Sequence, residues 1–448
     1  MRQQLLTDGA HKIDYEIRDI VKKATQLQKI GKTIYWENIG DPIVKNCQIP
    51  SWLKDIVADL AQENKSYGYS HSKGEPETRA FLAELNNSYG GAKLSEEDIL
   101  FFNGLGDAIG KIYQFLNPFS RIIGPSPAYS THSSLEAAHS NKEPLTYSLD
   151  PENNWYPDLE DLYLKVKYNP SIVGILIINP DNPTGMVYPK EYMERIVEIA
   201  QKFDLFIISD EIYGNIIYNE ATTFRLSEVI GNTPGIALKG ISKELPWPGS
   251  RCGWMEFYNR NKDDQFSEYC ITLENAKMVE VCSTTLPQKS IPIIMGHPKY
   301  KDYIKFRNNS IADRSTIIES YFSENPFIYF NKTNGAFYNT LVFKNNALKK
   351  GQHLPIDNPK VQQILMQWIS TDIALDKHFA YSLLASTGIC VTPLSSFQSD
   401  LMGFRITLLE EDDEMLHYIF KNISEAITTY CTSTLENPEL LISKKTEV

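Results

Sequence analysis

Long apolar runs, paired cysteines and excess positive charge are all scarce in this chain of 448 residues. No segment approaches the roughly 20 consecutive apolar residues that span a bilayer, so no membrane partner is expected. The first residues mix polar and charged types and lack the apolar stretch of a secretory signal. The six cysteines are scattered without a CxxC pair, which favours a reducing cytoplasm over an oxidising compartment.

The charge balance restricts the partners further. A net charge of −12 argues against nucleic acid as the main partner, because phosphate binding requires a basic patch. The composition is 42% apolar and 22% charged, which is typical of a folded, soluble protein. A chain of this length can form one large domain and a smaller one.

The middle of the chain alternates strand-like and helix-like segments. Residues 172–178 (IVGILII) are a short β-branched run, which predicts a strand buried on both faces. Residues 189–203 carry apolar side chains at helical spacing, and residues 205–209 (LFIIS) predict another buried strand. This alternation predicts an α/β fold with a mostly parallel sheet flanked by helices. Further strands are expected at residues 99–102, 121–124, 236–239 and 252–256.

The amino-terminal forty residues differ from this middle part. They predict an arm and an amphipathic helix whose apolar face is formed by Ile13, Ile17, Ile20, Val21 and Ala24. Such a face requires a partner surface, and we expect the arm to pack against the carboxyl-terminal part of the chain.

The character of the sequence changes again near residue 300. Longer charged helices there surround a few strands, which we expect at residues 336–343 and 404–409. The predicted division is an arm with its helix over residues 1–48, a large domain over 49–300, and a small α+β domain over 301–448.

Polar residues follow four of the expected strands. The segments are Asn103–Asp107, Asn179–Gly185, Asp210–Tyr213 and Gly240–Lys243. Ligands of open parallel sheets bind at the carboxyl ends of the strands. We therefore expect an amide, a carboxylate, a phenol and a lysine to meet at one edge of the sheet.

These segments carry motifs of one family. Asn179–Gly185 reads NPDNPTG, a strand ends in Asp210 with Tyr213 three residues on, and the SK pair ending at Lys243 precedes an arginine by eight residues. Together the motifs resemble the class I/II aminotransferases, which are pyridoxal-phosphate enzymes of the aspartate aminotransferase fold. The motifs keep the family's order over residues 38–405, which is most of the chain.

The resemblance implies an enzyme that moves an amino group between an L-amino acid and a 2-oxo acid by a ping-pong mechanism. It also implies a homodimer whose active sites are shared between subunits. Another reaction on the same scaffold, such as carbon–sulfur β-elimination, decarboxylation or a synthase step, remains an alternative. A non-catalytic regulatory module that binds the cofactor is a more remote one, because only about forty residues precede Gly40 and the chain is acidic. No metal site is predicted.

The resemblance assigns the central role to Lys243, which would hold pyridoxal phosphate as a Schiff base and then act as a general base. Asp210 matches the carboxylate that keeps the pyridine nitrogen protonated. Tyr213 and Asn182 match the groups that contact the ring hydroxyl. Taken alone, each has an ordinary alternative, because lysines are mostly surface residues and Asn and Asp are common in turns.

The phosphate site is implied by a helix start and two further residues. Leu105, Gly106 and Asp107 open a helix, and free N–H groups at such a start bind phosphate. Arg251 would add a charge-assisted contact, and Ser242 precedes the lysine as the family has it.

Two aromatic positions complete the implied cofactor site. Tyr129 matches the ring that stacks on the cofactor, with a half-buried core aromatic as its alternative. Tyr69 resembles the tyrosine that a neighbouring subunit donates to the phosphate, and Tyr67 competes for this role.

The substrate site is implied by three residues. Arg405 matches the arginine that grips the α-carboxylate through two parallel hydrogen bonds, and an exposed strand-edge arginine is its alternative. Asn182 would contact the same carboxylate. Gly40 resembles the early glycine whose backbone closes over the substrate.

The sequence also departs from the family pattern. Gly240 stands where the family usually has serine, so one hydroxyl contact to the phosphate is missing. Residues 244–249 (ELPWPG) are rich in proline and tryptophan, which predicts a stiffer loop after the lysine. Gly106 stands where some acidic-substrate relatives carry a lysine, which weakens the case for aspartate or glutamate as the specific substrate.

Overall fold

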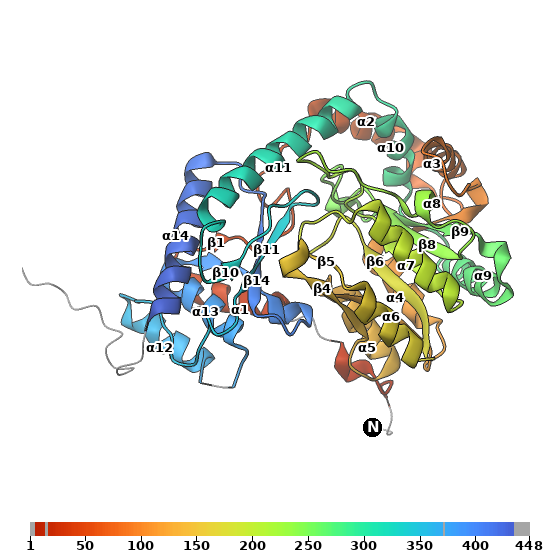
Figure 1. The fold of residues 1–448 in the computed structure, drawn as a ribbon. Helices are drawn as coiled ribbons and strands as arrows, with labels where there is room; N and C mark the ends of the chain where they lie inside the picture. Colours follow the sequence, from red (N-terminus) through yellow and green to blue (C-terminus); the bar gives the residue numbers. More distant parts are fainter. Residues whose placement is uncertain (1–4, 14–16, 371, 434–448) are drawn as a thin grey trace, which may run out of the picture.

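Two β-sheets and one long helix between them organise the protein (Figure 1). The computed structural model describes residues 5–13, 17–370 and 372–433. Eight strands form the large sheet and four form the small one. In the part of the chain that the structure describes, no helix combines the length and the apolar character that a membrane crossing requires.

The large sheet has the order β2-β9-β8-β7-β6-β3-β4-β5. Neighbouring strands from β8 to β4 are parallel, while β9 is antiparallel to both of its neighbours. Two reversals restore the direction, so β2 runs the same way as the parallel strands, and its carboxyl end lies at the same edge as theirs. The strand bounds are β2 (Ile99–Phe102), β3 (Arg121–Ser126), β4 (Thr146–Asp150), β5 (Tyr156–Pro157), β6 (Ile172–Ile178), β7 (Phe206–Asp210), β8 (Gly235–Gly240) and β9 (Gly253–Tyr258).

Helices cover both faces of the large sheet because alternate strand residues point to opposite sides. Ile175 and Ile177 of β6 join one core cluster, and Leu176 and Ile178 join another. The first cluster includes side chains from α2 (Ser51–Gln62), α3 (Pro76–Ser88), α6 (Leu159–Tyr168), α7 (Lys190–Lys202), α8 (Leu226–Val229) and α10 (Thr285–Met295). The second lies under α4 (Leu105–Gln114), α5 (Ser130–Ser140) and α9 (Asp264–Val279). The α/β prediction is confirmed.

The expected strands agree with the structure to within about two residues at each end. The runs 99–102 and 172–178 are strands with the predicted bounds, since both are short, wholly apolar and buried. The helix expected at 189–203 begins at Lys190, with Pro189 as its N-cap residue. The strand expected at 252–256 starts one residue later and is antiparallel to both of its neighbours.

The small sheet is antiparallel and has the order β10-β11-β14-β13. The strands expected at residues 336–343 and 404–409 correspond to β11 and β14, with bounds shifted by one or two residues. The bounds are β10 (Ile328–Tyr329), β11 (Tyr338–Phe343), β13 (Thr392–Pro393) and β14 (Gly403–Thr407), with helices α11 (Tyr300–Phe322), α12 (Pro359–Trp368), α13 (Leu375–Thr387) and α14 (Asp413–Thr432).

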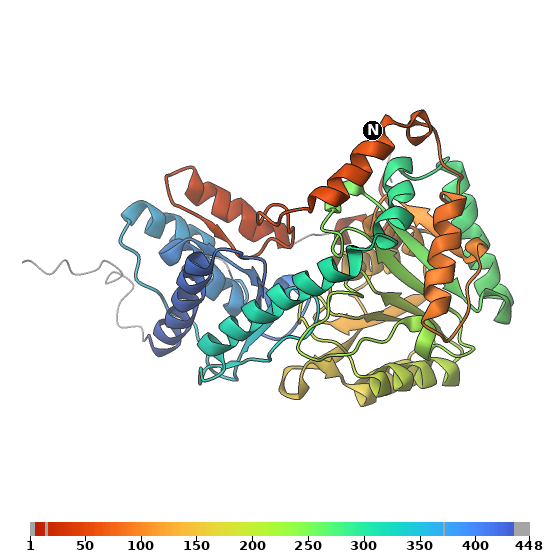
Figure 2. The same cartoon turned by 90° about the horizontal axis from the view of Figure 1, so that it is seen from above.

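The amino-terminal segment contacts two parts of the molecule. Its first turn, Ala10–Lys12, lies against α5, and Lys12 forms an ion pair with Glu143, whereas its helix and strand pack against the carboxyl-terminal part. Figure 2 shows α1 (Ile17–Gln28) beside the helices that follow residue 350. β1 (Tyr35–Trp36) pairs in parallel with β12 (Ile389–Cys390). Short 3₁₀ helices connect other elements, at Ala10–Lys12, Asn64–Tyr67, Glu96–Asp98, Pro151–Asn153, Pro248–Ser250, Arg260–Lys262 and Leu394–Phe397.

The predicted apolar face of the first helix is only partly correct. Ile20 and Ala24 are buried, and Val21 packs against them at the edge of the same cluster. Ile13 lies before the helix and is 63% exposed, so it is not part of that face. The side chain of Ile17 lies outside the described residues. The division into segments 1–48, 49–300 and 301–448 stays a prediction.

Candidate active site

A cavity of about 310 Å³ lies at the carboxyl ends of the parallel strands, between the two sheets. Eleven of the thirteen site residues predicted from the sequence line it, so the expected convergence is what the fold produces. The eleven are Gly40, Leu105, Gly106, Tyr129, Asn182, Asp210, Tyr213, Ser242, Lys243, Arg251 and Arg405. Asp107 and Tyr69 are not in the lining. The sequence did not point to Asn38, Ile109, Ile178, Ile212, Pro248 or Tyr338, which complete it.

Lys243 reaches the cavity from the loop that follows β8. Its Nζ donates a hydrogen bond of 2.7 Å to the carbonyl oxygen of Gly40 and lies 5.7 Å from the centre of the Phe337 ring. Its polar partner is thus a neutral carbonyl, and no carboxylate of the described residues lies within ion-pair distance of this amine. A lysine held in this way can exchange its partner for a reacting carbonyl group.

Asp210 is the last residue of β7, and its buried carboxylate is fixed on two sides. His132 Nε2 lies 3.1 Å from one carboxylate oxygen, and the backbone N–H of Ile212 donates to the other at 3.2 Å. His132 was not predicted. It lies in the first turn of α5, three residues after Tyr129, which is the N-cap residue of that helix.

Tyr213 is buried, and its hydroxyl donates to the hydroxyl of Tyr338 over 3.2 Å. Burial raises the pKa of Tyr213 well above its ordinary value, so the phenol stays protonated and can serve as a donor. Tyr338 belongs to β11 of the small sheet. The site therefore includes a phenol pair that joins the two sheets, and only Tyr213 was predicted.

Arg405 enters the cavity from β14, the central neighbour of β11 in the small sheet. Its Nη1 donates to Asn182 Oδ1 at 3.1 Å, and its Nη2 donates to the carbonyl of Asn38 at 2.7 Å. Its Nε is buried and finds no hydrogen-bond partner among the described residues. The guanidinium lies 4.3 Å from the Tyr338 ring centre, so it is fixed in place with donor capacity left for an incoming carboxylate.

The opposite end of the cavity is built by a helix start and Arg251. Leu105 and Gly106 open α4, and Gly104 precedes them with a φ of 84°. A Cβ atom at Gly104 would lie 2.4 Å from Arg251 Nη2, and the positive φ disfavours any residue with a side chain at this position. A Cβ at Gly106 would meet nothing within 4 Å, which shows open space in front of the helix start.

Asp107 is placed differently from the other predicted phosphate residues. Its carboxylate accepts hydrogen bonds from the backbone N–H of Asn103 at 3.0 Å and from Lys277 Nζ at 3.2 Å. The side chain therefore points away from the cavity and caps the turn that opens α4.

Neither candidate tyrosine for the shared site reaches this cavity within one chain. Tyr69 is 86% exposed and Tyr67 is 77% exposed. The hydroxyl of Tyr67 donates to the carbonyl of Ala61 at 2.9 Å, whereas no hydrogen bond is recorded for Tyr69 within the described residues. The role of Tyr69 stays a prediction that requires a second subunit.

These residues fit pyridoxal phosphate. The cavity offers an anchored carboxylate for the ring nitrogen, an amine for the aldehyde, and a helix start with Arg251 for the phosphate. The unpaired Nε of Arg405 remains for a substrate carboxylate. No group of three or more His, Cys, Asp or Glu residues in the described ranges is arranged to hold a metal ion.

Residues 38–423 match the family model described as aminotransferase class I and II. The chain belongs to this family. It is a pyridoxal-phosphate-dependent aminotransferase, which transfers an amino group between an amino acid and a 2-oxo acid in two successive half-reactions.

The relatives agree with this assignment over most of the chain. An uncharacterized aminotransferase of Methanocaldococcus jannaschii is 51% identical over 430 residues, which cover 96% of this chain and 99% of that protein. The glutamate-pyruvate aminotransferase of Escherichia coli K12 is 32% identical over 63% of this chain and 68% of its own length. The solved structure of an alanine aminotransferase from Pyrococcus furiosus superposes with a TM-score of 0.81 at 25% identity, covering 94% of this chain and 99% of its own.

Proposed function

We propose that the transamination takes place in the cavity around Lys243, with this residue as both the cofactor attachment point and the proton carrier. The convergence of Lys243, Asp210 and Arg405 in one cavity supports this most directly, because they come from the loop after β8, the end of β7 and the middle of β14, which belong to two different sheets. A lysine, an anchored carboxylate and a partly free guanidinium match the three functions that the reaction needs.

The proposed roles follow from the surroundings of each side chain. Arg405 would bind the α-carboxylate of the amino acid through its free Nε and one Nη, next to the amide of Asn182. Lys243 would then lie over the α-carbon and move its proton. Asp210 would keep the cofactor's ring nitrogen protonated, with Tyr213 donating to the ring hydroxyl. When bound, the cofactor supplies the electron sink for the bond broken at the α-carbon.

A small, uncharged amino acid is the best first candidate for the amino donor. The cationic side chains that line the cavity in the described chain are Lys243, Arg251 and Arg405, and each has a role above. No further cation is left in this lining for a side-chain carboxylate. L-alanine has no side-chain carboxylate and therefore requires no further cation. A dicarboxylic partner such as glutamate would require a cation from a second subunit. Relatives named alanine aminotransferase and glutamate-pyruvate aminotransferase agree with this pair.

We also propose a cytoplasmic homodimer with shared active sites. The exposure of Tyr69 supports it, because this large aromatic side chain is 86% exposed in the single chain and a second subunit would remove its apolar surface from water. Other large apolar side chains are exposed as well, among them Tyr67 beside it in sequence and Met278, Val279 and Ile293 of α9 and α10. Sedimentation of the purified protein and the activity of a mixture of Tyr69→Phe and Lys243→Ala variants test this, since shared sites would restore one functional centre per mixed dimer.

The decisive experiment is the visible absorption spectrum of the purified protein with amino acids added one at a time. A band that L-alanine bleaches and one 2-oxo acid restores would support the proposal and identify the substrate pair. Release of ammonia and pyruvate without any 2-oxo acid acceptor would instead favour elimination on the same scaffold. A spectrum without any such band after addition of the cofactor would contradict the role of Lys243.

A further inference from the structure

Helix α11 links the two sheets of the molecule directly. It runs over Tyr300–Phe322, from the end of α10 beside the large sheet to α14 beside the small one (Figures 1 and 2). Its first half contacts the loops that follow β7 and β8, and its second half packs with α14 beside the small sheet. Because an α-helix is stiff and rises 1.5 Å per residue, a displacement at one end reaches the other.

The first half of α11 binds the peptide of the cofactor lysine itself. Arg307 Nη1 donates to the carbonyl oxygen of Lys243 at 3.1 Å and also to that of Glu244. The Arg307 side chain is buried, and its charge sits where few solvent molecules can replace these contacts. Hydrogen bonds from a charged donor are the strong ones in proteins. The backbone that positions Lys243 is therefore fastened to α11.

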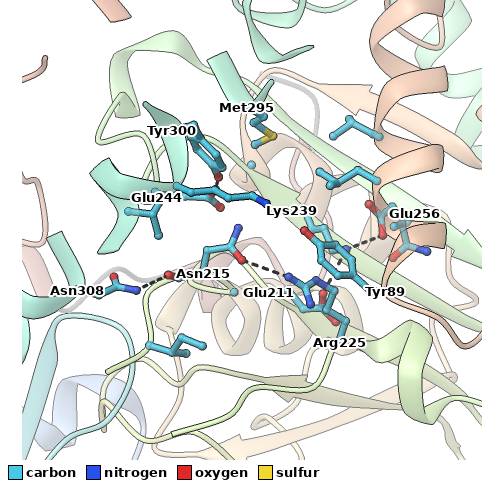
Figure 3. A pocket seen from close by; sticks show the side chains of 18 of the residues that line it. Tyr89, Glu211, Asn215, Arg225, Lys239, Glu244, Glu256, Met295, Tyr300 and Asn308 are labelled. Carbon is cyan, nitrogen blue, oxygen red and sulfur yellow. Dashed lines mark hydrogen bonds and ion pairs between the residues drawn. The ribbon is translucent and has the colours of Figure 1, made fainter. Parts of the chain in front are cut away.

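Two more contacts hold the same loops from α11. The hydroxyl of Tyr300 donates to the carboxylate of Glu244, and Asn308 Nδ2 donates to the carbonyl of Asn215 at 2.9 Å. Asn215 lies in the loop after β7, two residues beyond Tyr213. Figure 3 shows both contacts at the edge of a cavity of about 560 Å³ on the far side of these loops. Because a cavity and not packed side chains adjoins the loops on this side, these polar contacts hold the loops in position.

The second half of α11 binds the segment that follows Arg405. Arg314 Nη1 donates to the carbonyl oxygen of Leu408 at 3.1 Å, and its Nη2 lies 3.6 Å from a carboxylate oxygen of Glu411. Leu408 is three residues beyond Arg405 on the chain. Arg307 and Arg314 are separated by two helical turns, or about 10 Å. One stiff element thus contacts the backbone of the lysine and the backbone next to the carboxylate-binding arginine.

From these contacts we propose that Arg307 is a positioning residue that ties the Lys243 peptide to α11, so that carboxylate binding at Arg405 changes the position of Lys243. This inference rests on the proposed roles of Lys243 and Arg405. It concerns the backbone contact of Arg307 and is independent of the identity of the amino acid substrate.

The test compares the holoenzyme with its Arg307→Gln and Arg307→Lys variants. Lys305→Gln is the matched control, because Lys305 is exposed on the same helix, its substitution removes the same charge, and it forms no hydrogen bond or ion pair with the described residues. Propionate serves as the probe, since it carries the carboxylate of alanine without an amino group and cannot react. The readouts are the pH midpoint of the visible band with and without propionate, and the amide hydrogen exchange of residues 241–247.

The expected result is a propionate-induced shift of the midpoint in the wild type and in Lys305→Gln, at least halved in Arg307→Gln and partly recovered in Arg307→Lys. Exchange in residues 241–247 should rise about tenfold in Arg307→Gln, as expected for the loss of a charge-assisted hydrogen bond. If Arg307→Gln does not fold, Arg307→Lys and Tyr300→Phe carry the same comparison.

A propionate response and an exchange rate equal to those of the wild type in the Arg307 variants would overturn the inference. So would a wild type whose band ignores propionate while amino acids still bleach it, because the coupling would then be absent. Failure of the proposed function looks different, since no band dependent on Lys243 would form in any of these proteins.

Discussion

His132 Nε2 lies 3.1 Å from the carboxylate of Asp210, and both side chains are buried, Asp210 in the lining of the active-site cavity and His132 outside that lining. The contact fixes the carboxylate that faces the cofactor ring. We expect His132→Ala to weaken cofactor binding about 10- to 100-fold, the range expected when a hydrogen bond to a charged group is lost.

The measurement is a titration of the cofactor-free protein with pyridoxal phosphate, followed by absorbance. His139→Ala is the control, because His139 is a second histidine of α5 that contacts two backbone carbonyls and the ring of Tyr113 and does not line the cavity. Equal cofactor affinity in the two variants would mean that the contact with Asp210 has no functional role.

Lys243→Ala should abolish turnover, with a loss of at least about 10⁴-fold, because both the attachment of the cofactor and the proton transfer depend on this amine. The visible band that arises from attachment should disappear, while the melting temperature stays within a few degrees of the wild type. Lys305→Ala, at an exposed position of α11, should retain both activity and band. Turnover by Lys243→Ala without an added amine would refute the assignment.

Arg405→Lys and Arg251→Lys should separate substrate binding from cofactor binding. Lysine keeps the positive charge but loses the planar pair of donors. Arg405→Lys is expected to raise KM for the amino acid about 10- to 100-fold and to leave cofactor affinity unchanged. Arg251→Lys is expected to do the opposite, since Arg251 lies at the helix start of α4.

Steady-state kinetics over a range of amino acid concentrations, together with cofactor titrations, measure the two effects. If both variants weaken the cofactor and leave KM alone, Arg405 does not bind the substrate carboxylate.

The sequence predicted the parts of the site that depend on one sheet. The apolar run of β6 and the strand end at Asp210 are local patterns, and parallel strands necessarily bring their carboxyl ends to one edge. Lys243, Asp210 and Asn182 could therefore be placed in a common site before the structure was known. The identity of the cofactor came from the family motifs rather than from these local patterns.

Residues contributed by the rest of the molecule could not be predicted in this way. Tyr338 and Asn38 reach the cavity only because the small sheet and the amino-terminal segment pack beside the large sheet. Arg307 contacts a carbonyl 64 residues earlier in the chain, and in the sequence it is one charged residue of a charged helix. The side chain of Asp107 accepts a hydrogen bond from Lys277, which lies 170 residues further along the chain. Such contacts depend on tertiary packing and leave no periodic signal.

Asp181 should make stability depend on pH near neutrality. It is wholly buried, and burial raises the pKa of its carboxyl from 3.8 to about 7. The folded protein therefore holds a proton that the unfolded chain releases between about pH 4 and pH 7. Stability from this group is present at low pH and is lost as the pH rises, by about 4 kcal/mol in total for a shift of this size.

The measurement compares the free energy of unfolding of wild type and Asp181→Asn in the cofactor-free protein from pH 5 to pH 8. Asparagine cannot ionise, so the variant should gain stability relative to the wild type as the pH rises. Asp204→Asn is the control, because Asp204 is exposed and adopts a positive φ of 54° that asparagine tolerates. Parallel curves for wild type and Asp181→Asn would show that this carboxyl does not titrate in the range.

Gly40 and Tyr338 should be coupled through their close approach. A Cβ atom at Gly40 would lie 1.9 Å from the Tyr338 hydroxyl oxygen and 2.8 Å from Cζ, with the Tyr338 ring packed on the Arg405 guanidinium. We expect Gly40→Ala to cost about 1–3 kcal/mol of unfolding free energy, as overpacking does, and to lower activity by moving Tyr338.

A double-mutant cycle tests this coupling. Tyr338→Phe removes the atom of closest approach but leaves Cζ, so it should recover part of the stability lost in Gly40→Ala. Gly110→Ala in α4 is the control, since a Cβ there meets nothing within 4 Å and alanine favours the helix. Additive effects of Gly40→Ala and Tyr338→Phe would mean that the two residues do not constrain each other, and that another contact closes this side of the cavity.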